Sequence, residues 1–148
     1  YCYDSSYNSF ALHGRYGKAD LSQYPQAGVA IQYSKDFHEL PVSNLTIFNR
    51  ILPWGGGAYF RLMPFWLFRQ GVKRIAKRSG DYIMYIHPWE IDAQQPRVHQ
   101  ASLFRKFRHY SFLERTERKL KNMMMYFSDC RWISCGDYLM RKGVPIGH

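Results

Sequence analysis

A histidine ends an apolar run in the segment YIMYIHPWEID, residues 82–92. The apolar run predicts a strand that is buried on both faces, and strand pairing should stop at His87 because Pro88 lacks a backbone donor. In parallel α/β architectures, binding and catalytic groups lie where strands end. An imidazole exchanges a proton near neutral pH, as a general acid or base must. His87 is therefore a candidate catalytic residue, and a structural histidine that caps the strand is the alternative.

An aromatic residue and two acids follow this histidine. A carboxylate beside an imidazole favours its protonated form, so Glu90 is a candidate partner of His87 or of a substrate. Strand alternation would place the two on opposite faces, and they meet only if the chain turns after Pro88. Trp89 could stack on a sugar ring through its apolar face or pack against the protein, and packing is the favoured interpretation.

Three further residues are candidates for substrate binding. Asp4 lies at a predicted strand end in YDSS, and His13 lies in HGRYG, a loop flanked by glycines of the kind that often carries binding groups. Arg61 follows the glycine run 55–57 closely enough for both to contact one anionic or hydroxyl-rich ligand. Such glycines allow backbone or ligand to approach closely, although composition favours a flexible turn. His99 and His109 are interpreted as surface residues.

Helices and strands alternate in the expected secondary structure, which indicates the α/β class. We expect strands at 1–4 and near 37–48, where Pro41 marks an edge, and a third at 81–87. A stripe of apolar residues predicts a helix over 64–78, with Pro64 at its start and Gly80 at its stop. A second stripe predicts a helix over 111–127, with Glu117 four residues ahead of Lys121. We expect a polar loop at 93–108 and a short strand and turn at 131–140.

Composition limits the possible functions. The 148 residues suffice for one domain, and no apolar run approaches the roughly 18 residues of a membrane span. The formal net charge is +10, with basic residues concentrated in 69–78 and 105–121. Such stretches attract nucleic acid, anionic lipid or acidic polysaccharide, although solvated helix faces are the favoured interpretation. Three cysteines form neither a disulfide framework nor a pattern of zinc ligands.

Five segments occur in an order and spacing that resemble a known family: YDSS, HGRYG, LPWGGGAYFRLMP, YIHPWEIDAQQPR and FRHYSFLERTERKL. They look like the C-terminal half of polysaccharide deacetylases of the NodB-homology class, which are similar to carbohydrate esterase family 4. The closest resemblance is to the subgroup tied to exopolysaccharide loci, which carries the HPWEID segment in a C-terminal region. The resemblance extends from Tyr1 to about Phe127.

The resemblance implies an enzyme that removes acetyl groups from N-acetylated sugars of a polymer, in a bacterial cell-envelope polysaccharide pathway. It implies a deformed (β/α) barrel, with its last strands and helices in residues 1–92 and a helical C-terminal extension in residues 93–148 that packs on the barrel. The full-length protein would hold one divalent metal, usually zinc. His87 matches the late histidine that protonates the leaving amine.

The metal-binding motifs of that family, an Asp-Asp pair and a His-x-x-x-His pair, do not occur in this sequence. We therefore expect a fragment of a longer gene product, which binds no metal by itself and does not catalyse deacetylation alone. A non-catalytic carbohydrate-binding module that uses Trp54, Tyr59 and Trp89 is the alternative. A nucleic-acid partner ranks last because no motif of known docking geometry is present. The sequence indicates neither localisation nor oligomeric state.

Overall fold

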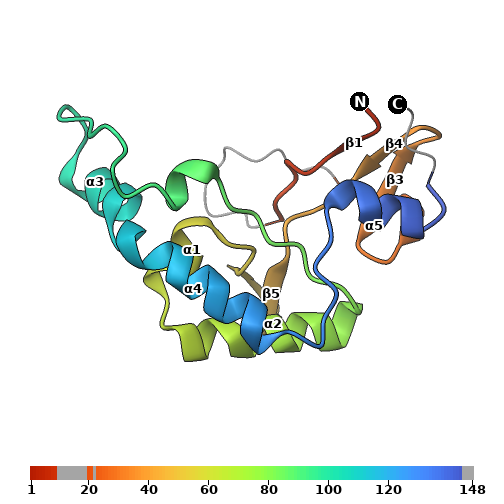
Figure 1. The fold of residues 1–148 in the computed structure, drawn as a ribbon. Helices are drawn as coiled ribbons and strands as arrows, with labels where there is room; N and C mark the ends of the chain where they lie inside the picture. Colours follow the sequence, from red (N-terminus) through yellow and green to blue (C-terminus); the bar gives the residue numbers. More distant parts are fainter. Residues whose placement is uncertain (10–19, 22, 145–148) are drawn as a thin grey trace.

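The computed structural model describes residues 1–9, 20–21 and 23–144, and Figure 1 shows its strands and helices. The strands are β1 (Tyr3–Asp4), β2 (Gln26–Ala27), β3 (Ala30–Ser34), β4 (Phe37–Glu39), β5 (Asn44–Ile47) and β6 (Arg50–Pro53). The helices are α1 (Gly57–Leu62), α2 (Phe65–Ser79), α3 (Leu103–Tyr110), α4 (Leu113–Tyr126) and α5 (Cys135–Arg141), with a 3-10 turn η1 (Pro88–Glu90). The chain is thus α/β, as predicted. No closed barrel forms among the described residues, so the barrel and the division at residue 92 stay predictions.

The strands form two separate sheets. The larger has the order β1-β4-β3-β2, in which β1 runs parallel to β4 and the other pairs are antiparallel. The smaller is the β5–β6 hairpin, whose turn residues Phe48 and Asn49 have φ of 46° and 59°. Positive φ at both central residues is typical of a type I′ turn, which matches the twist of the paired strands. The segment predicted as one strand near 37–48 therefore forms parts of two sheets, on either side of Pro41.

Helix α2 confirms the helix predicted over 64–78. Pro64 precedes it, and Gly80 ends it with a φ of 79° and a backbone N–H that donates to the carbonyl of Ala76 at 2.8 Å. A residue at positive φ favours glycine, so the stop is encoded locally. The buried side of α2 consists of Phe68, Gly71, Val72 and Ile75.

Helix α4 confirms the second predicted helix. Leu113, Thr116 and Phe127 are buried as its stripe predicts, and Lys121 Nζ lies 2.6 Å from Glu117 Oε1. The stripe predicted that Met124 would be buried, but Met123 is fully buried and Met124 is 44% exposed. The buried face is thus shifted by one residue near the end of the helix. The helix turns by about 100° per residue, so a shift of one residue exchanges the buried side chain for its neighbour.

The buried strand predicted over 81–87 is not present. This segment is extended but makes only a single bridge, between Tyr85 and Gly56, and Tyr85 is 43% exposed. Its apolar side chains pack into two different clusters, because Tyr82, Met84 and Ile86 contact one and Ile83 contacts the other. A run that passes between two clusters is apolar on both sides, as a strand in a parallel sheet would be.

Two helices replace predicted irregular or extended segments. Residues 103–110, most of which were predicted as loop, form α3. In its first turn, Arg105 N donates to Ser102 Oγ at 3.5 Å. Residues 135–141, predicted as strand and turn, form α5, in which Asp137 N donates to Ser134 Oγ at 3.1 Å. Serine at an N-cap is the local signal that both predictions overlooked.

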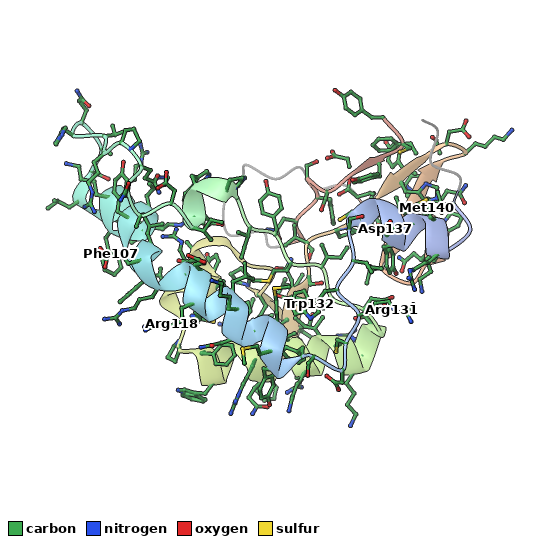
Figure 2. The ribbon with its side chains drawn as sticks, viewed as in Figure 1. Phe107, Arg118, Arg131, Trp132, Asp137 and Met140 are labelled. Atoms are coloured by element: carbon green, nitrogen blue, oxygen red, sulfur yellow. The ribbon has the colours of Figure 1, made fainter. Side chains whose placement is uncertain are left out.

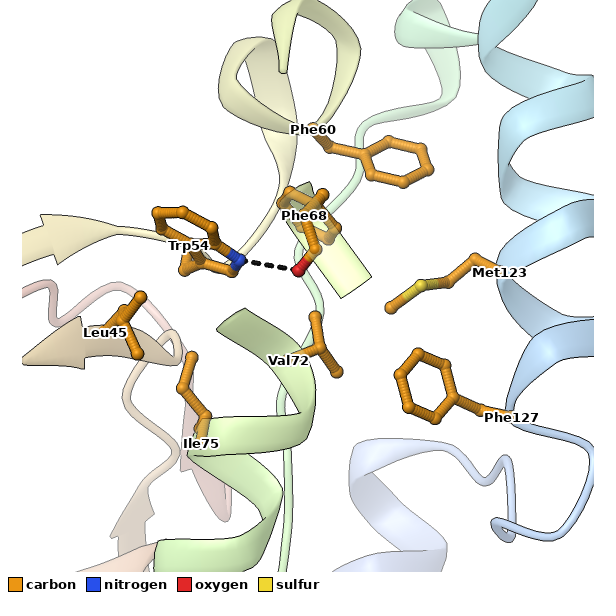
Figure 3. Close-up of a cluster of buried hydrophobic side chains, with 8 residues drawn as sticks. All are labelled: Leu45, Trp54, Phe60, Phe68, Val72, Ile75, Met123 and Phe127. Carbon is orange, nitrogen blue, oxygen red and sulfur yellow. Dashed lines mark hydrogen bonds between the residues drawn. The ribbon is translucent and has the colours of Figure 1, made fainter. Parts of the chain in front are cut away.

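The main hydrophobic cluster joins the hairpin to three helices. Figure 3 shows its eight buried side chains, which are Leu45, Trp54, Phe60, Phe68, Val72, Ile75, Met123 and Phe127. Trp54 Nε1 donates to the carbonyl of Phe68 at 2.8 Å, so the indole is satisfied inside this cluster. A second cluster, of Ala30, Leu40 and Leu139, attaches α5 to the larger sheet.

Different secondary-structure elements form the two ends of the molecule. Helix α3 lies at one end, and the larger sheet with α5 lies at the other (Figure 1). Phe107 projects from α3 and is 57% exposed, whereas Asp137 and Met140 mark α5 at the opposite end (Figure 2). Within the described ranges, no helix combines the length and the apolar character that crossing a bilayer demands.

Candidate functional site

A groove of about 730 Å³ brings together segments from much of the chain. One part of its lining comes from the residues after β1 and from β5, and another comes from the glycine run and α1. The segment that ends at η1 and the residues of α3 complete it. The lining includes Ser5, Ser6, Asn8, Asn44, Gly55, Gly56, Gly57, Tyr59, Arg61, Tyr85, His87, Trp89, Glu90, Arg105, Lys106, Arg108 and His109.

The glycine run sets the spacing between two sides of the groove. Tyr85 N donates to the carbonyl of Gly55 at 2.7 Å, and Gly57 N donates to the carbonyl of Tyr85 at 3.1 Å. Gly56 has a φ of 133°, and a Cβ at this position would lie 2.2 Å from the carbonyl oxygen of Tyr85. Only glycine fits such an approach, so this run makes a close backbone contact and is not the flexible turn that composition favoured.

The chain turns after Pro88, which brings Glu90 back to His87. Glu90 N donates to the carbonyl of His87 at 3.0 Å, and His87 N donates to Glu90 Oε2 at 3.1 Å. The turn meets the condition under which these two residues could approach each other. Both hydrogen bonds use backbone atoms of His87, so the orientation of its imidazole depends on other neighbouring residues.

Arg61 and Glu90 form a buried ion pair beside the groove. Arg61 Nε lies 3.3 Å from Glu90 Oε1, and the two residues are 4% and 1% exposed. The remaining guanidinium nitrogens donate to the carbonyls of Arg108, His109 and Ser111 at 3.0, 2.8 and 3.0 Å. Burial lowers the pKa of Arg61, and Glu90 opposes that shift. These contacts fix η1 against the end of α3, and a role of either residue in substrate binding stays a prediction.

Aromatic rings form a row along the groove. The imidazole of His87 stands edge-on to Tyr85, with ring centroids 4.6 Å apart, and lies nearly parallel to Trp89 at 5.4 Å. Trp89 lies nearly parallel to His109 at 4.3 Å. The indole therefore packs against protein rings, in accordance with the favoured interpretation of Trp89.

The two histidines of this row differ in their partners. His109 Nε2 lies 2.9 Å from Gln95 Oε1, and burial, followed by the charge of Arg61, lowers the His109 pKa. His109 is thus partly buried in the groove lining, less exposed than the surface position predicted for it. His87 is partly buried and lines the groove, with its imidazole between the rings of Tyr85 and Trp89. Both histidines line the groove.

The remaining predicted site residues fall elsewhere. Asp4 is exposed and is not part of the groove lining. Its carboxylate accepts from Ser5 N at 2.7 Å and from Ser6 Oγ at 2.5 Å, and these two serines do line the groove. His13 lies outside the described residues.

The divalent metal that the resemblance implies does not fit the described part of the chain. No three of its His, Cys, Asp or Glu residues lie together in a group that could hold a metal ion. All three cysteines are free, and burial raises the pKa of the Cys130 and Cys135 thiols.

Several lining residues were not singled out from the sequence. Asn8 and Asn44 contribute amide groups, and Asn44 Nδ2 donates to Asn8 Oδ1 at 2.7 Å and to Ser9 Oγ at 3.0 Å. Isolated asparagines carry no pattern that a sequence could reveal. The run Arg105, Lys106 and Arg108 does carry a charge signal, but its place on the groove depends on the unpredicted helix α3.

Comparison with protein-family models gives one match. The model described as a domain of unknown function, DUF3473, matches residues 5–140, which is most of the chain. The chain therefore belongs to this family, a domain known as the C-terminal region of polysaccharide deacetylases. Neither a curated protein nor a solved structure matches the chain.

Proposed function

We propose that this member of the DUF3473 family is the C-terminal part of a metal-dependent polysaccharide deacetylase, in which His87 is the general acid. The reaction is the hydrolysis of N-acetyl groups of a polymeric sugar, which yields acetate and a free amine. One observation carries the assignment to His87: it lies on the wall of a groove, where its imidazole contacts the rings of Tyr85 and Trp89. The family match supports the reaction class.

The chemistry requires a proton at the nitrogen of the scissile bond. An amine is a poor leaving group until it is protonated, and a positioned acid typically contributes about 10²–10⁴-fold to the rate. Protonated His87 gives its proton to the nitrogen as the carbon–nitrogen bond breaks, and the neutral imidazole remains. Tyr85 and Trp89 contact the ring and restrict its orientation, which reduces the entropy lost in reaching the reactive geometry.

The lining of the groove suits a sugar. Ser5, Ser6, Asn8 and Asn44 offer hydroxyl and amide groups for sugar hydroxyls, and the rings of Tyr59 and Tyr85 offer apolar surface. Activation of the attacking water is assigned to residues outside the described part of the chain. We assign the activity to a bacterial cell-envelope pathway, exopolysaccharide biosynthesis, with a polysaccharide rather than a nucleic acid as the partner.

The test is acetate release from acetylated oligosaccharides by the complete gene product that contains this chain. His87→Gln should lower the rate by about 10²–10⁴-fold while oligosaccharide binding is retained, because the acid acts on the leaving group. His99→Gln, at an exposed position outside the groove lining, is the matched control and should leave the rate unchanged. Full activity of His87→Gln would overturn the assignment.

A non-catalytic carbohydrate-binding module is the second candidate. The hydroxyl, amide and aromatic groups of the groove favour it, because they could bind a sugar without any acid. The same experiment separates the two functions. Oligosaccharide binding without acetate release by the complete gene product would favour the binding module.

A further inference from the structure

The charges along the groove are predominantly of one sign. Its charged lining residues are Arg61, Glu90, Arg105, Lys106 and Arg108. Arg61 and Glu90 neutralise each other in their buried pair, with 3.3 Å between Nε and Oε1. No ion pair in the described part of the chain involves the other three side chains, so three positive charges remain without an acidic partner.

These three cations come from one helix on one side of the groove. Arg105 and Arg108 are three residues apart on α3, which places them as neighbours on the helix surface. Lys106 lines the groove and also an adjacent smaller cavity, which Arg97 lines as well. The guanidinium carbon of Arg108 lies 5.9 Å from the centre of the Tyr59 ring. This contact orients Arg108 over a groove-lining ring without using its N–H donors.

A concave surface with an excess of one charge concentrates ligands of the opposite charge. Guanidinium groups bind carboxylates through paired hydrogen bonds, which makes arginine selective for planar acids. The other side of the groove, at Asn8 and Asn44, carries neutral groups that suit sugar hydroxyls. The groove therefore combines a cationic side with a neutral polar side.

Building on the proposed function, we infer that the substrate is an acidic polysaccharide with carboxylate groups along its chain. The carboxylates of such a polymer lie against Arg105, Lys106 and Arg108, while an N-acetylated sugar lies near His87. A nucleic acid would match the cationic side as well. The neutral hydroxyl and amide groups opposite favour the sugar.

The experiment compares two oligosaccharides of equal length that both carry N-acetyl groups. A hyaluronan oligosaccharide carries a carboxylate on every second sugar, and a chitin oligosaccharide carries none. We expect the protein to bind the hyaluronan oligosaccharide at least ~10-fold more tightly at low salt. The preference should disappear near about 1 M salt, where the Debye length is about 3 Å.

Charge variants locate the preference. Arg105→Gln, Lys106→Gln and Arg108→Gln together should remove the preference, because they weaken hyaluronan binding more than chitin binding. The matched control combines Arg74→Gln, Lys77→Gln and Arg78→Gln, which removes the same charge from exposed positions of α2 outside the groove lining. The control should keep the preference, whereas equal loss in both variants would overturn the inference, because the effect would then follow net charge alone.

The remaining outcomes separate this inference from the proposed function. Chitin binding without a preference for hyaluronan overturns only the acidic substrate. If neither oligosaccharide binds, the groove is not a sugar site and both proposals fall. The last ligand tested is single-stranded DNA of equal charge. If it binds as tightly as hyaluronan and loses affinity equally in the groove variant, the groove does not select sugars and the inference is overturned.

Discussion

The Nε atom of Arg61 lies 3.3 Å from the Oε1 atom of Glu90, and both side chains are almost completely buried. The two residues come from α1 and η1, and Arg61 also donates to the carbonyls of Arg108, His109 and Ser111. One guanidinium thus connects the glycine run, the histidine segment and the end of α3. The shape of the groove depends on this single group.

Removal of Arg61 should therefore be costly. Arg61→Met removes the cation that pairs with the buried Glu90 carboxylate and the donor to three carbonyls, and we expect the free energy of unfolding to fall by about 3–5 kcal/mol. Urea denaturation measures the loss. The double variant Arg61→Met, Glu90→Leu should lose less than the sum of its single variants, because no unpaired charge remains. An effect of Arg61→Met below about 0.5 kcal/mol, the usual range of surface substitutions, would contradict this role.

Gly71→Ala should destabilise the protein, contrary to helix propensity. Alanine in a helix interior normally gains about 1 kcal/mol over glycine. Here a Cβ would lie 2.1 Å from Cε2 and Nε1 of Trp54, whose ring is held by its hydrogen bond to Phe68. Overpacking of this kind costs roughly 1–3 kcal/mol. Thermal unfolding of Gly71→Ala should show a lower midpoint, while Gln70→Ala on the exposed side of α2 stays close to wild type. A raised midpoint for Gly71→Ala would argue against this packing.

Lys119 should make stability depend on alkaline pH. Its Nζ donates to the carbonyls of Phe60, Arg61 and Met63, and burial lowers its pKa from 10.5 to about 8. The folded chain loses this proton near pH 8, whereas the unfolded chain keeps it until near pH 10.5. The unfolded state therefore binds more protons in this window, and the free energy of unfolding rises with pH.

The measurement for Lys119 is the difference in unfolding free energy between wild type and Lys119→Met. Other groups that titrate in the same window cancel in this difference. As pH rises from 8 to 10.5, we expect the free energy of unfolding of wild type to increase relative to that of Lys119→Met. A flat or opposite trend would show that burial does not control this lysine.

His109 should lower the free energy of unfolding at acidic pH. Burial, followed by the charge of Arg61, lowers its pKa below the ordinary value of 6.5. As pH falls below 6.5, the unfolded chain takes up the proton before the folded chain does, so the free energy of unfolding decreases. Urea denaturation at a series of pH values should show a smaller decrease for His109→Gln. Identical pH profiles for the variant and wild type would refute this contribution.

Local patterns determined the two long helices and the class of the fold. Phe68, Val72 and Ile75 recur at helical spacing, and Pro64 and Gly80 carry their start and stop signals within the segment. These signals act between near neighbours, so they are visible in the sequence. The sequence also singled out His87 and the glycine run, and the close backbone contact of that run requires a residue without a Cβ.

Tertiary structure decided what those elements position. The extended segment 82–87 looks like a strand but passes between two hydrophobic clusters, and α3 was predicted as a loop. Arg61 meets Glu90 across 29 residues of chain, and the row from His87 to His109 depends on how η1 lies against α3. No local periodicity encodes such contacts, because they arise only when packing of distant segments compensates the entropy of ordering them. The sequence thus identified the histidine, and only the fold built a groove around it.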